Sequence, residues 1–303
     1  MLRYNQLIRA TILVMAMALL LPVTASAQTL ERIKSTGTFN VGFVPDEAPF
    51  SFKSEDNQAV GYSVELCRNV ADTLKAKLGL PGLTVKYTAT SLAAGLEMVE
   101  GGRIDILCGA ASDTLKRRES VSFSIPIFTT GTGALLRKDA PPALVSVLKG
   151  EPARTGPIWR GSINLGLSNY TYAVHAGTVT EEWVRDKIRT LGVIATVVTV
   201  EDHAKGVEMV AKKKADAYFA DRVLLENYAT RSKYADKLMV LDRYFTYEPI
   251  ALAMARNDDD FRLVVDTTLS KLYNSGEIVQ IYKNYFGEPG DTTLLLFKIY
   301  ARY

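Results

Sequence analysis

The chain is poor in the residues that most often build metal sites and in charge of one sign. It holds two Cys and two His in 303 residues, without the spacing of zinc ligands, so an ordinary structural zinc site is excluded. The formal net charge is +3, and basic residues gather only in short runs such as Lys212 to Lys214, which excludes the strongly basic profile of a nucleic-acid binder. With 48% hydrophobic and 23% charged residues, the composition is that of a globular protein, and its length allows one large domain or two ordinary ones.

The first 27 residues have the pattern of a cleavable export signal. Arg3 and Arg9 lead into the uncharged run Ala10 to Val23, and Ala25-Ser26-Ala27 has the small-x-small pattern of a cleavage site. The alternative is a buried or membrane-spanning helix, but Pro22 ends the run short of the roughly twenty apolar residues that a span needs. No Cys follows that could carry a lipid. We therefore expect cleavage after Ala27 and a mature protein in the periplasm, an oxidising compartment.

Short apolar runs alternate with helical patterns from Thr38 onward, which is typical of an α/β fold. Phe39 to Phe43 reads as a strand and Gly61 to Leu78 as a helix, and a second α/β set begins with the strand Tyr172 to His175. A segment rich in Pro and Gly joins the two sets at 137 to 170. This organisation indicates two lobes, and a cleft between lobes is the expected ligand site.

One loop has an unusual composition. The strand Ile104 to Cys108 runs into the small residues of Gly109 to Thr114, which let a backbone come close to a ligand. Ser112 offers a hydroxyl, and Arg117 offers a two-pronged donor for a carboxylate. The alternative is a polar turn followed by solvated basic side chains.

Two further candidates follow predicted strands of the second set. Thr178 and Glu181 have the spacing of a capping box, and the helix N-terminus that it predicts is either an anion site or an ordinary capped helix. Asp221 comes just after the strand Ala217 to Phe219, where open α/β sheets bind ligands. Its carboxylate could hold an ammonium or cap the next helix, and spacing does not choose between these roles.

Motifs along nearly the whole mature chain together carry a family resemblance. They are Gly42, Ala48-Pro49-Phe50-Ser51-Phe52, Gly61-Tyr62-Ser63-Val64-Glu65-Leu66, Gly102-Arg103-Ile104-Asp105, Arg117, Phe123-Ser124, Ala176 to Trp183, Tyr247 to Ala253, Ser275-Gly276-Glu277 and Tyr285-Phe286-Gly287. In this order they resemble the periplasmic amino-acid-binding proteins of ABC transporters, the type II, family 3 solute-binding group. The Cys108-Gly109 loop and Asp202-His203 resemble its glutamate/aspartate-binding subgroup most.

The resemblance implies a two-lobed periplasmic-binding-protein-like II fold of the α/β class. The larger lobe would hold residues 28–135 and 248–303 and the smaller lobe residues 136–247, with Leu135 to Lys138 and Tyr247 to Ala251 as crossing hinge strands. It also implies a monomer without cofactor that captures an amino acid between its lobes and delivers it to an inner-membrane ABC permease.

The resemblance also assigns roles to the candidate residues. Arg117 falls where the family grips the ligand α-carboxylate, and Ser112 where a hydroxyl contacts the α-amino and carboxylate groups. Thr178 and Val179 lie at the smaller lobe's carboxylate-binding turn, and Asp221 matches the acid that takes the α-ammonium. Together they form a site for a zwitterion.

Some positions depart from the family pattern. The subgroup reads a side-chain carboxylate with Arg residues that fall at Val44 and Ala94 here, so an acidic ligand is not expected. Glu47 stands where relatives often place an aromatic, and its carboxylate disfavours an anionic ligand and favours a polar or cationic one. His203 either lines the cleft or is structural, and Phe50 is either a wall of the cleft or part of the core.

The two cysteines are expected to form a disulfide. Cys67 lies on the apolar face of the first helix with Val64, Val70 and Leu74, and Cys108 ends a strand that this helix should cover. Disulfides form in oxidising compartments. The alternative is two separate buried thiols.

Two other functions fit the same fold. An exported enzyme is one, since the periplasmic cyclohexadienyl dehydratases resemble this fold, and a sensory module feeding a membrane receptor is the other. Arg117, Ser112 and Asp221 together favour simple capture of a zwitterion, so we expect no enzymatic activity.

Overall fold

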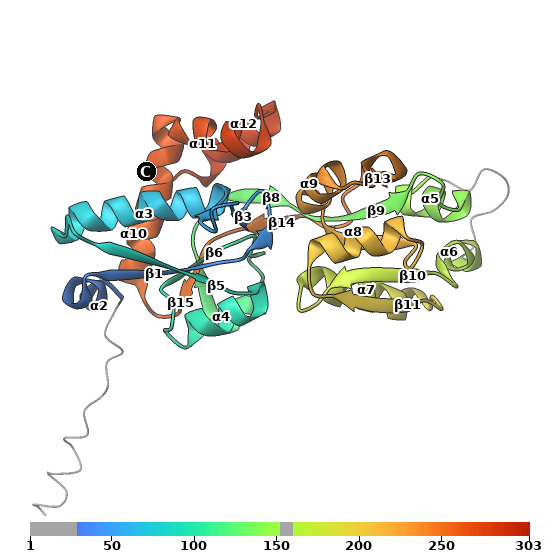
Figure 1. Cartoon of the computed structure of the whole chain (residues 1–303), viewed down its shortest axis with the longest axis horizontal. Helices are drawn as coiled ribbons and strands as arrows, with labels where there is room; N and C mark the ends of the chain where they lie inside the picture. The colour runs from blue at the N-terminus through green and yellow to red at the C-terminus, as the bar shows by residue number, and fades with distance from the viewer. Residues whose placement is uncertain (1–28, 152–159) are drawn as a thin grey trace, which may run out of the picture.

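The computed structural model describes residues 29–151 and 160–303 and shows two lobes side by side, each with a central sheet and helices packed on it (Figure 1). The two-lobed α/β fold expected from the sequence is confirmed. The export signal expected at residues 1–27 lies outside the described residues. Among residues 29–151 and 160–303, no helix combines the length and apolar character needed to cross a membrane.

The larger lobe is built on a five-stranded sheet in the order β5-β1-β6-β15-β7. Its strands are β1 (Thr38–Phe43), β5 (Thr84–Ala89), β6 (Ile106–Cys108), β7 (Val121–Phe123) and β15 (Ala253–Ala255). A small sheet of β2 (Asp46–Glu47), β3 (Ser51–Lys53) and β4 (Ala59–Val60) stands beside it. The helices are α2 (Thr29–Thr36), α3 (Tyr62–Leu78), α4 (Leu92–Glu100), α10 (Asp259–Ser275), α11 (Glu277–Phe286), α12 (Asp291–Tyr300) and the 3-10 turn η1 (Arg117–Glu119).

The smaller lobe is built on a second five-stranded sheet in the order β11-β10-β12-β9-β13. Its strands are β9 (Thr132–Arg137), β10 (Thr171–His175), β11 (Thr196–Val200), β12 (Ala217–Asp221) and β13 (Leu238–Val240). The helices are α5 (Pro142–Lys149), α6 (Arg160–Leu167), α7 (Val179–Leu191), α8 (His203–Ala211), α9 (Arg222–Arg231) and the 3-10 turn η2 (Ala235–Lys237).

Two antiparallel strands, β8 (Phe128–Thr130) and β14 (Glu248–Ile250), pair with each other between the lobes (Figure 1). The expected crossing strand Tyr247 to Ala251 contains β14. The other expected crossing strand is wrong in position. Leu135 to Lys138 overlaps β9, which pairs with β12 and β13 inside the smaller lobe, so the chain passes between the lobes a few residues earlier, at β8.

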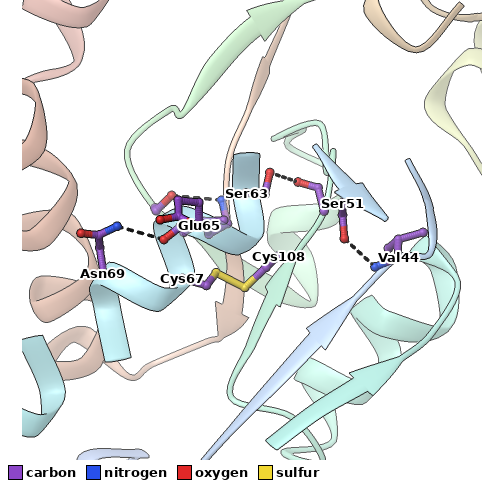
Figure 2. The surroundings of a disulfide bond; sticks show 10 residues. Val44, Ser51, Ser63, Glu65, Cys67, Asn69 and Cys108 are labelled. Atoms are coloured by element: carbon purple, nitrogen blue, oxygen red, sulfur yellow. Dashed lines mark hydrogen bonds between the residues drawn. A yellow bond between two sulfur atoms is a disulfide. The ribbon is translucent and has the colours of Figure 1, made fainter. Parts of the chain in front are cut away.

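The predicted disulfide is confirmed, and it joins helix α3 to the end of strand β6. Figure 2 shows Cys67 and Cys108 joined beneath the N-terminal turn of α3, and their Cα atoms are 6.5 Å apart. Two hydrogen bonds hold the same region: Ser63 Oγ donates to the Gly109 carbonyl at 2.9 Å, and the Val44 N–H donates to Ser51 Oγ at 2.9 Å. The disulfide and the Ser63–Gly109 hydrogen bond therefore hold the start of the loop that follows β6 in place.

The apolar C-terminal segment forms α12 and completes the core of the larger lobe. Phe297 and Tyr300 are buried, and their rings lie 5.6 and 6.0 Å from that of Tyr273. The Tyr300 hydroxyl also hydrogen-bonds to Thr129 Oγ1 on β8. The tail is thus part of the folded lobe and contacts a strand that runs between the lobes.

Candidate functional site

A small cavity lies between the two lobes, close to the crossing strands. Both lobes supply its walls, because the ends of β6 and β2 reach it from one side and those of β10 and β12 from the other. The residues that line it are Glu47, Leu92, Ala110, Ser112, Arg117, Gly131, Thr132, His175, Thr178, Val179, Thr180, His203, Ala220, Asp221, Leu224 and Glu248. All the residues that the sequence assigned to the ligand are among them, except Phe50.

The loop after β6 places Ser112 and Arg117 at the cavity. Arg117 Nη1 donates to the Ser112 carbonyl at 3.0 Å, and the Arg117 N–H donates to Thr114 Oγ1 at 3.2 Å, so the start of η1 is tied to the loop. Burial lowers the pKa of Arg117, while the charges of Glu47 and Glu248 act against that shift. The guanidinium remains protonated and forms no salt bridge with any residue in the described part of the chain. It can therefore receive a ligand carboxylate.

Glu47 reaches the cavity from the short strand β2 and is only 2% exposed. Its Oε2 accepts a hydrogen bond of 2.6 Å from the Ala110 N–H. A Cβ at Gly109 would lie 2.6 Å from the same oxygen, so only glycine allows this approach. Burial raises the pKa of Glu47 to about 8, while the Ala110 N–H and the charge of Arg117 act in the opposite direction. The carboxyl group is thus held in place and is easily protonated when the cavity is empty.

The N-terminus of α7 forms another wall, and the expected cap by Thr178 is present, while the Glu181 carboxylate bonds to the Gly177 N–H in place of the Thr178 N–H of a capping box. Thr178 Oγ1 accepts from the Glu181 N–H at 3.2 Å and donates to the His175 carbonyl at 2.8 Å. The Glu181 carboxylate accepts from the Gly177 N–H at 2.9 Å. Thr178 and Val179 both line the cavity, so the positive end of the helix dipole lies at the site and favours a negative group there.

Asp221 ends β12 and caps α9, so one of its two expected roles is observed directly. Its Oδ1 accepts from Thr130 Oγ1 at 3.0 Å and from the N–H groups of Val223 and Leu224 at 2.9 and 3.4 Å. No described residue donates to Oδ2, so this oxygen can also receive a ligand ammonium. Burial raises the pKa of Asp221 to about 7, the three hydrogen bonds oppose the shift, and the charge of Glu248 adds to it.

His203 borders the cavity, but its contacts are those of a core residue. It is 3% exposed, its Nδ1 lies 2.7 Å from the Tyr218 hydroxyl, and its ring centroid is 4.6 Å from that of His175. Burial, with a smaller contribution from His175, lowers the pKa of His203 to about 3. The ring is therefore neutral at physiological pH and supplies shape rather than charge to the cavity.

Phe50 does not line the cavity, so the expectation that it walls the ligand needs correction. It is 0% exposed and packs in the core of the larger lobe, with ring centroids 5.0 Å from Phe128, 5.3 Å from Phe286 and 6.3 Å from Tyr62. An aromatic residue next to a ligand loop carries the same sequence signal whether it faces the core or the cleft, and here it faces the core.

Four polar lining residues, Thr132, His175, Thr180 and Glu248, were not among the candidates chosen from the sequence. Thr132 and Thr180 come from different elements of the smaller lobe, and their hydroxyl oxygens are 3.2 Å apart. His175 ends β10, and half-buried Glu248 begins β14 and accepts from Thr246 Oγ1 at 2.9 Å. Glu248 could have been found, since it lies in the segment expected to cross between the lobes.

The lobes touch each other on both sides of the cavity. Lys116 Nζ of the larger lobe lies 2.6 Å from Glu182 Oε1 on α7, and the Tyr228 hydroxyl on α9 donates to the Asp46 carbonyl at 2.7 Å. The structure thus has the lobes closed around the site.

Comparisons with known proteins agree with this architecture. Residues 39–288 match the model of the bacterial extracellular solute-binding proteins, family 3. An L-glutamate/L-aspartate-binding protein from Pseudomonas aeruginosa is 28% identical over 279 residues, covering 91% of this chain and 86% of the relative. The L-cystine-binding protein TcyJ from Escherichia coli K12 is 23% identical, covering 90% of this chain and 93% of the relative. The expected likeness to the glutamate/aspartate-binding subgroup is confirmed.

Solved structures show the same fold. The ancestral amino acid-binding protein AncCDT-1, described as a precursor of cyclohexadienyl dehydratase, superposes with a TM-score of 0.69 at 25% identity, over 86% of this chain and all of that one. The solute receptor for L-cysteine of Neisseria gonorrhoeae gives a TM-score of 0.69 at 20% identity, over 85% and 93% of the two chains.

Proposed function

Because the chain belongs to family 3 of the bacterial extracellular solute-binding proteins, we propose that it captures an amino acid between its two lobes and delivers it to an inner-membrane ABC permease. Relatives named for glutamate and aspartate, and for cystine, support an amino-acid ligand. The protein works in the periplasm as a monomer, after cleavage of the export signal behind Ala27.

The observation that carries the proposal is the pairing of opposite charges across one cavity. Arg117 and the N-terminus of α7 offer positive charge and N–H donors to an α-carboxylate. Asp221 Oδ2 offers negative charge to an α-ammonium, while Oδ1 remains occupied by the helix cap. Ser112, whose hydroxyl bonds to no described residue, lines the same cavity and can bond either ligand group.

Closure supplies the rest of the capture mechanism. Arg117 belongs to the larger lobe, whereas Thr178 and Asp221 belong to the smaller one, so a bound zwitterion contacts both. Bending at β8 and β14 would open the cavity, and ligand contacts from both lobes would favour the closed form. The permease then recognises the closed protein.

The site is proposed to bind without catalysis. A neutral amino acid satisfies the charges of Arg117 and Asp221 in its ground state, which leaves no developing charge for these residues to stabilise. AncCDT-1, the dehydratase precursor to which this chain is similar, is itself described as an amino acid-binding protein. The alternative function is that of an exported dehydratase, and the ligand screen described next tests it as well.

A thermal-shift screen with the standard amino acids, ornithine, citrulline and prephenate tests the proposal. We expect at least one amino acid to stabilise the protein, by about 2.7 kcal/mol at a concentration of a hundred Kd. Glutamate and aspartate should not be that ligand, because Val44 and Ala94 supply no donor for a second carboxylate and lie outside the cavity lining. Stabilisation by prephenate together with its turnover, and no response to amino acids, would favour the enzyme.

A further inference from the structure

The cavity carries more negative than positive groups. Its lining includes the carboxyl groups of Glu47, Asp221 and Glu248 but one guanidinium, that of Arg117. An ordinary zwitterion brings one carboxylate for Arg117 and one ammonium for Asp221. It therefore supplies no cation to half-buried Glu248 or to Glu47, whose buried carboxyl group ionises only at a cost unless a cation lies beside it.

Glu47 is the carboxyl group that the fold fixes most firmly. It is 2% exposed, the Ala110 N–H donates to it at 2.6 Å, and the absence of a side chain at Gly109 makes room for it. One hydrogen bond does not satisfy a carboxylate, and no Lys or Arg in the described part of the chain forms a salt bridge with it. The structure holds this group at the cavity with capacity for another donor.

The charged groups around Glu47 come from several elements. Asp46 is its neighbour on β2, Arg117 reaches the site from η1, and Asp221 faces it from the end of β12. The two acids disfavour ionisation of Glu47, whereas the Ala110 N–H and the charge of Arg117 favour it. In the ligand complex the carboxylate of the ligand takes up the charge of Arg117, so the remaining local field favours a cation beside Glu47.

We propose that the ligand is a dibasic amino acid whose side-chain cation pairs with Glu47, while its α-carboxylate and α-ammonium bind Arg117 and Asp221. This inference rests on the proposed function and narrows it. The burial that holds the pKa of Glu47 at about 8 in the empty site implies that binding of the cation expels a proton from this carboxyl. Glu248, half-buried on β14, also lines the cavity, and its charge acts on Arg117 and Asp221.

Pairs of ligands that differ by one charge test the proposal. Isothermal titration calorimetry compares L-arginine with its neutral isostere L-citrulline, and L-lysine with L-norleucine, on the full mature chain. The cationic ligand of each pair can form a charge-assisted hydrogen bond to Glu47 that the neutral ligand lacks. We therefore expect the cationic member of at least one pair to bind about 10- to 150-fold more tightly than the neutral member. Titration in two buffers of different ionisation enthalpy should show a proton released with the cationic ligand.

The variant Glu47→Gln should reduce that preference to less than about threefold, since the amide keeps the acceptor for Ala110 but loses the charge. Glu97→Gln, an exposed carboxylate on α4, is the matched control and should keep the preference. Equal binding of both members in the wild type, or a preference that survives in Glu47→Gln, would overturn the proposal while leaving amino-acid capture intact. Binding of no amino acid at all would overturn the proposed function and this inference with it.

Discussion

At the scale of single residues, the cavity is lined by ionisable groups whose charged forms are disfavoured by burial. Arg117 is half-buried without a salt-bridge partner among the described residues, and Glu47 and Asp221 have pKa values raised by burial. Each of these groups lowers the folding stability of the unliganded protein. A ligand that supplies the opposite charge offsets this loss. Such groups are typical of binding sites rather than of structural ion pairs.

The variant Arg117→Ala should lose most of its affinity for the ligand and remain folded. Loss of one charge-assisted hydrogen bond predicts about 10- to 150-fold weaker binding, since the ligand carboxylate stays buried without its partner. Arg118→Ala is the matched control, because the neighbouring Arg118 pairs with Asp113 at 2.5 Å. Calorimetry on both variants decides the role of Arg117, and wild-type affinity in Arg117→Ala would remove it from the site.

The stability of the unliganded protein should fall as the pH rises from about 5 to 8. The pKa of Glu47 is raised from 4.5 to about 8 and that of Asp221 from 3.8 to about 7, so the folded state keeps protons that the unfolded chain releases in this range. The free energy of unfolding then decreases with pH. We expect Glu47→Gln to flatten the profile by roughly 3 to 4 kcal/mol across the range. Urea unfolding at several pH values measures this, and parallel profiles for both proteins would contradict it.

At the scale of elements, the disulfide links the helix and the strand that position the ligand loop. Cys67 lies in α3 and Cys108 ends β6, four residues before Ser112. The loop itself is fixed by Arg117 and by the hydrogen bond from Ser63 to Gly109. The disulfide should therefore act on stability more than on the ligand contacts.

The double variant Cys67→Ala/Cys108→Ala should lower the free energy of unfolding by about 3 to 4 kcal/mol, because the bond closes a loop of roughly forty residues. Ligand affinity should change less than about threefold. Urea unfolding and calorimetry on the same preparation separate the two effects. A large loss of affinity with little loss of stability would show that the bond shapes the site directly.

Much of this element-level picture could be predicted from the sequence. The apolar spacing of Val64, Cys67, Val70 and Leu74 predicted both α3 and the side that carries the disulfide. The position of β8 was missed, because the crossing strand at Leu135 to Lys138 was taken from the family resemblance, and the pairing of β9 with β12 that places it inside the smaller lobe is a long-range contact. Phe50 was ambiguous for a similar reason, since its burial depends on rings more than seventy residues away in the chain.

At the scale of the whole molecule, the two lobes meet through polar contacts near the cavity and through Leu224 of α9, which packs with the core of the larger lobe. The Lys116–Glu182 salt bridge is largely exposed and contributes little, and the Tyr228–Asp46 hydrogen bond lies at the other side of the cavity. A ligand that bonds to Arg117 and Asp221 adds contacts of greater strength across the same gap. The ligand should therefore decide whether the closed form prevails.

Small-angle X-ray scattering with and without the amino acid found in the screen tests this central claim most directly. The account predicts that the radius of gyration decreases when the wild-type protein is saturated, and that Arg117→Ala shows no decrease at the same ligand concentration. A radius of gyration that does not change at saturation, with binding proven by calorimetry on the same sample, would contradict capture by closure of two lobes.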